Sequence, residues 1–192
     1  HQPITLKDES GNEYVVTFDK KTGQIVGSAG GAGGGGGGTP SQKKISDALD
    51  GLQLVNQIIS SPVDIKYAFG INRLNPGALI PGSNAYNLKA QVAQLNSYLS
   101  LENRQKLKGS GSISDFEGKV LAAAATTLSN PNIDPAYAAI ELKKIRGVFR
   151  TAAGLSTTIR ITDPRTGETS VIEANRAGIE NALKDNLTVE YL

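Results

Sequence analysis

The chain has 192 residues, of which 39% are hydrophobic, and its 20 Lys and Arg residues against 18 Asp and Glu residues give a net charge of +2. This balance lacks the strong positive charge of a dedicated DNA-binding protein, and no apolar run approaches the length of about 20 residues that a membrane-spanning helix needs. Because the only histidine is His1 and cysteine is absent, His-assisted nucleophiles, thiolate metal sites and His-rich metal sites are excluded. Since the chain begins at His1 and contains no methionine, we expect it to be a fragment or a processed product.

Residues 1–26 are predicted to form an antiparallel β-meander, because short β-favouring runs alternate with turn sequences. An isolated sheet of two or three strands is marginally stable, so we expect it to lean on another surface. The strands are expected at residues 4–6, 14–18 and 24–26, and the turns at residues 10–12 and 19–23.

A glycine-rich linker is predicted at residues 27–39, because nine of the twelve residues from Gly27 to Gly38 are glycine. Glycine loses the most backbone freedom on ordering, so we expect neither a helix nor a strand in this run. The run lacks the Gly-Lys-Ser/Thr ending of a phosphate-binding loop. A flexible tether between folded parts is the favoured interpretation.

Residues 40–154 are predicted to form a helical bundle. Apolar residues recur at helical spacing, and proline, Ser and Asp residues stand where helices begin. An irregular connector with at most one short helical turn is expected at residues 62–82, where Pro and Gly are frequent. The helices are expected at residues 40–60, at residues 83–108, from residue 114 to residue 130, and from residue 134 onward.

Two surfaces of this bundle are predicted to bind partner subunits. The first is an apolar seam on the second helix, with alternating spacings of four and three residues: Leu88, Val92, Leu95 and Leu99. The second is a basic cluster on the fourth helix, which includes Lys143, Lys144 and Arg150. Few aromatic side chains lie near this cluster to stack on bases, so a partner-facing or solvated surface is favoured over phosphate contacts.

Ser114 and Glu117 have the spacing of a capping box, in which each side chain bonds to the backbone amide of the other residue. A carboxylate pair for glycosidase chemistry stays open among Asp115, Glu117, Asp134 and Glu141. The structural role is favoured, because capping already occupies Glu117 and the helix dipole favours acidic residues in a first turn. We therefore predict no catalytic, cofactor-binding or metal-binding residue.

Residues 155–192 are predicted to form a small β-β-α-β module. Two alternating segments, at residues 158–161 and 169–172, flank a turn at residues 163–167, and Asn175 can cap the helix that follows. A last strand is expected at residues 187–192. Together with the helical bundle and the N-terminal meander, this module gives an α+β fold class.

The segment from about Leu99 to Gly154 resembles a helical module of tailed-bacteriophage virion proteins. The similarity rests on residues 109–117, GSGSISDFE, which match the S-G-x-I-S-x-x-E break between helices in that module. An alanine-rich helix and a closing basic helix follow. The resemblance covers roughly a third of the chain and implies a packing and assembly element of a minor virion, internal, ejection or tail-associated protein. It implies no catalytic residue.

From these observations we expect a non-enzymatic virion structural protein, assembled in the host cytoplasm, that docks on neighbouring virion subunits through helical faces and strand edges. A homo- or hetero-oligomeric assembly is expected, without a small-molecule substrate, a cofactor or a membrane span. One alternative is the terminal, non-catalytic region of a virion-associated peptidoglycan-degrading enzyme. The other is an internal DNA-contacting or ejection protein, whose binding would weaken steeply with salt and with charge reversal at Lys143, Lys144 and Arg150.

Overall fold

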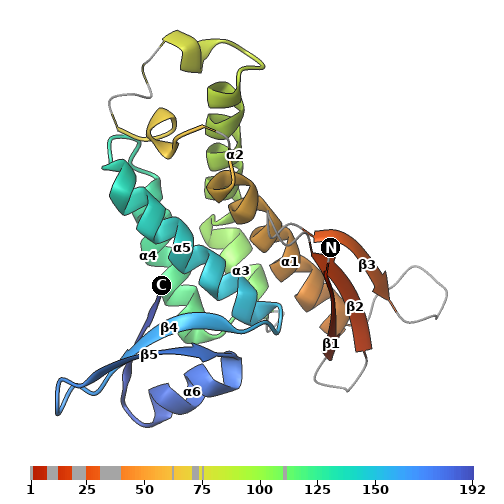
Figure 1. The fold of residues 1–192 in the computed structure, drawn as a ribbon, viewed down its shortest axis with the longest axis vertical. Helices are drawn as coiled ribbons and strands as arrows, with labels where there is room; N and C mark the ends of the chain where they lie inside the picture. Colours follow the sequence, from red (N-terminus) through yellow and green to blue (C-terminus); the bar gives the residue numbers. More distant parts are fainter. Residues whose placement is uncertain are drawn as a thin grey trace.

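The computed structural model describes residues 2–7, 13–18, 25–30, 40–61, 63–70, 74, 76–109 and 112–192. Within these residues the fold is α+β and mostly helical, with six α-helices and two three-stranded antiparallel sheets (Figure 1). The α+β class therefore agrees with the prediction. The C-terminal sheet and its helix lie at one end of the molecule's long axis (Figure 1).

The N-terminal sheet is antiparallel and has the strand order β1-β2-β3. Its strands are β1 (Gln2–Lys7), β2 (Glu13–Phe18) and β3 (Ile25–Gly30). The predicted turns at residues 10–12 and 19–23 lie outside the described residues.

The glycine-rich run begins inside β3. Gly27 lies opposite Thr17 and Gly30 lies opposite Tyr14 in the ladder with β2, so the prediction that this run contains no strand is wrong for residues 27–30. Strand pairing uses backbone groups alone, so glycine can extend the edge of a sheet in spite of its entropic cost. The remaining linker residues, 31–39, lie outside the described part of the chain.

Five α-helices follow, and α5 packs against both α1 and α4, while α2 packs on α1 and α3 packs on α4. Polar residues cap them as predicted: Asp134 accepts a hydrogen bond from the Ala136 amide (2.7 Å), and Ser83 accepts one from the Tyr86 amide (3.1 Å). The helices are α1 (Pro40–Ile59), α2 (Asn84–Tyr98), α3 (Leu101–Gly109), α4 (Asp115–Leu128) and α5 (Pro135–Ala152).

The single helix predicted at residues 83–108 is two helices, α2 and α3. Leu99 ends α2, with its amide bonded to the Leu95 and Ser97 carbonyls, and its side chain is buried in the core. The Ser100 hydroxyl then accepts a hydrogen bond from the Asn103 amide (3.4 Å) at the start of α3. The buried Leu99 thus ends α2 and the capping Ser100 begins α3, whereas the alternating spacings of four and three residues predicted one continuous helix.

The described residues of the connector between α1 and α2 include the 3₁₀ turns η1 (Ile65–Tyr67) and η3 (Pro76–Leu79), where at most one short helical turn was expected. Asp64 caps η1 by accepting a hydrogen bond from the Lys66 amide (2.9 Å). Phe69 is buried in the core and anchors the first half of the connector. η3 lies at the end of the molecule opposite to the C-terminal sheet (Figure 1).

The C-terminal elements have the predicted order of strand, strand, helix and strand. The sheet has the order β5-β4-β6, and the Asn175 side chain caps α6 by accepting from the Gly178 amide (3.0 Å). In the turn between β4 and β5, Asp163 accepts from the Arg165 amide (2.8 Å) and Gly167 adopts a positive φ of 76°. The elements are β4 (Thr157–Thr162), β5 (Thr169–Ala174), α6 (Arg176–Lys184) and β6 (Thr188–Tyr191).

The C-terminal sheet shares one hydrophobic core with the helices. Ile159 of β4 is fully buried, and the Tyr191 ring of β6 stacks on Phe116 of α4, with 6.2 Å between ring centroids. A Cβ atom at Gly147 would lie 2.5 Å from the Tyr191 Cδ1 atom, which is closer than side chains pack. The missing side chain at Gly147 therefore lets β6 lie directly on α5.

Candidate functional site

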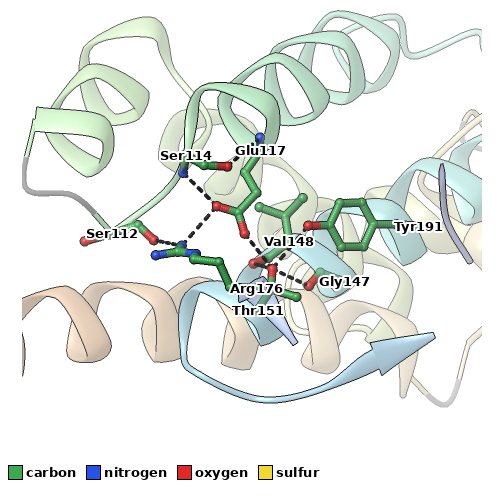
Figure 2. A network of polar contacts seen from close by, with 8 residues as sticks. All are labelled: Ser112, Ser114, Glu117, Gly147, Val148, Thr151, Arg176 and Tyr191. Carbon is green, nitrogen blue, oxygen red and sulfur yellow. Dashed lines mark hydrogen bonds and ion pairs between the residues drawn. The ribbon is translucent and has the colours of Figure 1, made fainter. Parts of the chain in front are cut away.

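A network of polar side chains centred on Glu117 lies where α4, α5, α6 and β6 meet (Figure 2). Glu117 and Thr151 are each 1% exposed and Tyr191 is 2% exposed. Arg176 enters the network from the first residue of α6. We call these four residues the Glu117 network.

Both carboxylate oxygens of Glu117 accept hydrogen bonds. Oε2 accepts from the Ser114 amide (2.7 Å) and from Nη2 of Arg176 (3.0 Å), while Oε1 accepts from the Thr151 hydroxyl (2.6 Å). The Ser114 hydroxyl accepts from the Glu117 amide (3.2 Å), so the predicted capping box is confirmed. The Glu117 carboxylate therefore links α4, α5 and α6 through hydrogen bonds.

The hydroxyl of Thr151 has one proton, and the shortest contact, to the Glu117 carboxylate, receives it. In the 3.2 Å contact between Thr151 and Tyr191, the Tyr191 phenol must then be the donor. Burial, followed by the negative charge of Glu117, raises the pKa of the Tyr191 phenol above its ordinary value. The phenol thus keeps the proton that it donates.

Arg176 links the start of α6 to the segment before α4. Its Nη2 atom donates to the Ser112 carbonyl (2.5 Å) as well as to Glu117, while its Nε atom is buried and has no hydrogen-bond partner among the described residues. Glu117, Thr151 and Tyr191 are buried among the elements that they join, while the Arg176 side chain is 27% exposed (Figure 2). Its evident role is to fasten the C-terminal module to the helices.

The four carboxylates left open for glycosidase chemistry each have a different local partner. Glu117 bonds within the network; Asp115 is exposed and pairs with Lys108 (2.6 Å). Asp134 caps α5, and Glu141 pairs with Lys144 (2.9 Å). The structure therefore assigns each of them a structural contact.

The apolar seam predicted to bind partners lies inside the protein. No member is more than 6% exposed, because α2 turns these side chains into the core that it shares with the other helices. The prediction that they bind a partner is corrected accordingly: the chain's own helices cover them. The residues concerned are Leu88, Val92, Leu95 and Leu99.

The basic cluster of α5 does not present three equivalent cations. Lys143 is exposed, Lys144 forms the ion pair with Glu141, and the Nε atom of Arg150 donates to the Ser156 carbonyl (2.9 Å). Burial and the neighbouring charge of Arg146 lower the pKa of Arg150. Two of the three side chains thus serve contacts within the chain.

Docking through strand edges was expected from the sequence, and the structure shows where one such edge lies. β5 lies at the edge of the C-terminal sheet. The Asp163 amide donates to the Glu168 carbonyl (2.9 Å), and bonded and non-bonded pairs alternate along antiparallel strands. This alternation turns the backbone groups of Thr169, Val171 and Glu173 away from β4.

The side chains of β5 are exposed from residue 169 to residue 173. Val171 is 56% exposed and Ile172 is 40% exposed, and because neighbouring strand residues point to opposite faces, both faces of the edge carry an apolar side chain. A period-two pattern identifies this strand in the sequence, but only the strand order β5-β4-β6 reveals that it is an edge.

Two depressions in the described surface have volumes of about 200 Å³ and about 270 Å³, below the roughly 300 Å³ at which small-molecule pockets begin. The first lies between α4, α5 and β6, beside the Glu117 network; the second lies between the end of α1 and the start of α2 and is lined mainly by amide and hydroxyl side chains. The edge of β5, with its exposed Val171 and Ile172 side chains, is therefore a stronger candidate for a binding site than either depression.

Among the described residues, no cluster of three or more His, Cys, Asp and Glu side chains is arranged to hold a metal ion. None of the described helices has the length and apolar character needed to cross a membrane. Comparison of the chain with protein-family models, with curated proteins and with solved structures finds no match.

Proposed function

We propose that the chain is a non-enzymatic structural subunit of a tailed-bacteriophage particle that binds neighbouring virion subunits through the free edge of β5. The virion assignment rests on the resemblance of residues 99–154 to the helical module of such proteins. The docking mode rests on one observation, an unpaired strand edge with exposed apolar side chains on both faces.

The edge of β5 has few of the features by which proteins block strand pairing. All six residues pair with β4 in regular register, and the strand contains no Pro and no Lys. A strand added by a neighbouring subunit would bond to the outward backbone groups of Thr169, Val171 and Glu173. It would also cover Val171 on one face of the sheet and Ile172 on the other.

In this proposal the helices α1 to α5 act as the bundle that carries the docking edge, and the N-terminal strands act as a meander tethered to it. Helical faces contribute through side chains that are exposed on α5, Tyr137 and Ile140, and not through the seam of α2. The assembly is homo- or hetero-oligomeric and belongs to the virion.

The first test is mass spectrometry of purified particles of the phage that encodes the chain. We expect its peptides in the particles at a constant ratio to the major capsid protein. Their absence from particles would refute the virion assignment, and their occurrence within a longer polypeptide that includes a hydrolase domain would favour the peptidoglycan-degrading alternative.

The second test concerns the edge itself. Val171→Lys places a charge on the exposed edge strand, and we expect it to reduce incorporation into particles at least tenfold. Thr166→Lys, in the exposed turn beside β5, adds the same charge off the edge and should leave incorporation unchanged. Equal incorporation of both variants, with far-UV circular dichroism spectra like the parent, would refute docking through β5.

A further inference from the structure

The outward residues of β5 form a set that is symmetric about Val171. Thr169, Val171 and Glu173 turn their backbone groups away from β4, as the alternation along the ladder of β4 and β5 requires. All residues from 164 to 173 are exposed, and the hairpin of β4 and β5 projects from the helices (Figure 1). Another strand can therefore approach this edge along its whole length.

The symmetry selects one register for pairing with a second copy of β5. In an antiparallel pair, the residues that exchange hydrogen bonds lie directly opposite each other. All three outward residues of each copy are matched only when Val171 lies opposite Val171 of the other copy and Thr169 lies opposite Glu173. A shift by two residues in either direction leaves one outward residue of each copy without a partner in β5. A two-fold axis at Val171 then closes the interface with two copies.

The side chains agree with this register. On one face the exposed Val171 side chains of the two copies meet, and each Glu173 faces a Thr169 hydroxyl. The two Glu173 carboxylates are about 13 Å apart along the strands, so no like charges lie directly opposite each other. On the other face Ile172 lies opposite Ser170, and the two Ile172 side chains are diagonal neighbours at about 7–8 Å. Both exposed apolar side chains of the edge would thus be covered.

The charged groups beside this edge already have partners within the chain. Arg160 lies next to Val171 in the ladder of β4 and β5, and its Nη1 atom pairs with Oε2 of Glu190 (2.7 Å). The Glu173 carboxylate accepts a hydrogen bond from the Thr158 hydroxyl. The approach of a second copy therefore brings no unpaired cation to the two-fold axis.

We propose that the subunit bound at the edge of β5 is a second copy of the chain, with the two C-terminal sheets joined around a two-fold axis at Val171. The joined sheet has six antiparallel strands in the order β6-β4-β5-β5-β4-β6. This inference rests on the proposed docking through β5 and names its partner. A foreign strand could satisfy the same backbone groups, but the second copy also matches the side chains and closes the assembly.

The chain contains no cysteine, so a single introduced Cys tests the register. In the proposed pair the two copies of residue 171 have Cα atoms about 5.5 Å apart, within the span of about 4.4–6.8 Å that a disulfide bridges. Under mild oxidation of the full chain, Val171→Cys should form a covalent dimer. The matched control, Thr169→Cys on the same face of the strand, lies about 13 Å from its copy and should form at least tenfold less. Equal cross-linking of the two variants would overturn the proposal.

Sedimentation equilibrium of the full chain tests the pairing without a cross-link. The parent chain should show a concentration-dependent dimer, and Val171→Lys and Val171→Glu alone should each raise the dissociation constant at least tenfold, because like charges then meet at the axis. An equimolar mixture of the two variants should recover the dimer, since Lys then faces Glu. A monomeric parent, or a mixture that stays monomeric, would overturn the proposal.

The two proposals at this edge fail differently. If the parent is monomeric while Val171→Lys is still lost from particles, docking through β5 stands and a different subunit is its partner, which refutes the second copy. If the parent forms the dimer while Val171→Lys enters particles normally, pairing with the second copy is supported and docking in the particle through β5 is refuted.

Discussion

Replacing Glu117 with alanine tests whether the buried network joins the C-terminal module to the helices. The substitution removes the acceptor of three hydrogen bonds, from the Ser114 amide, the Thr151 hydroxyl and the Arg176 guanidinium. Water cannot replace the carboxylate easily, because the site is enclosed and Glu117 is 1% exposed. The donors would be left without their partner inside the protein.

The expected cost follows from these contacts. Removing one partner of a buried ion pair costs about 3–5 kcal/mol. The lower end applies here, because the Arg176 side chain is 27% exposed and keeps its bond to the Ser112 carbonyl. Loss of the capping box costs about 1 kcal/mol. The free energy of unfolding should therefore fall by about 3–4 kcal/mol, out of a total of about 5–15 kcal/mol, with a melting temperature about 6–16 °C lower.

Urea unfolding of the purified chain, followed by circular dichroism, measures this loss. Asp115→Ala is the matched control, since Asp115 occupies the same first turn of α4 but is exposed and forms a surface ion pair with Lys108. This variant should unfold close to the parent chain. Adding Arg176→Met to Glu117→Ala should recover part of the loss, because the unpaired guanidinium is then absent.

The reasoning is refuted if Glu117→Ala and Asp115→Ala unfold at the same urea concentration with the same dependence on urea. The network would then contribute no more than an exposed acidic residue. A failure of Arg176→Met to recover stability would refute only the assigned cause, the unpaired cation, and would leave the measured loss to the capping box and Thr151.

Two further predictions concern the core and the pH dependence. Gly147→Ala should lower the free energy of unfolding by about 1–3 kcal/mol, because its Cβ atom would lie 2.5 Å from the Tyr191 ring; unchanged urea unfolding would contradict the close packing of β6 on α5. Burial, and then the charges of Asp47 and Asp50, raise the pKa of Tyr98 to about 12, above the value of about 10 in an unfolded chain. The stabilisation by the protonated phenol is therefore complete below about pH 10 and lost between about pH 10 and 12. Over that range, the free energy of unfolding measured in urea should fall less for Tyr98→Phe than for the parent chain.

Local signals in the sequence predicted local structure well. Ser114 and Glu117 form their capping box, Asp134 and Pro135 begin α5, and Asn175 caps α6. Each of these features depends on residues within a few positions of one another. The distance along the chain over which a cap acts is short enough for the sequence pattern to identify both partners.

Contacts between distant residues were not predictable in the same way. Glu117 meets Thr151, Arg176 and Tyr191 at separations of 34 residues or more, and no spacing rule connects them. The sequence predicted that Glu117 caps α4. It did not predict the contacts of Glu117 with Thr151 and Arg176, which join α4 to α5 and to the C-terminal module.

The seam of α2 illustrates a second limit. A stripe of Leu88, Val92 and Leu95 has the same pattern whether the partner helix belongs to the same chain or to another one. The structure places the stripe in the chain's own core. Exposed large apolar side chains lie elsewhere, on η3 and the turn after it, on the edge strand β5, and on α5, where Tyr137 and Ile140 are exposed.

The exposed side chains of η3 and the turn after it differ in kind from the exposed edge of β5. The edge of β5 offers a row of outward backbone groups and so suits another strand, whereas Leu79 and Ile80 offer exposed apolar side chains alone. They lie at opposite ends of the molecule (Figure 1), so one small partner cannot cover both. The continuous core and the Glu117 network between them hold the two ends in one body. A chain built in this way keeps its two ends at a set separation, which a flexible linker alone could not maintain.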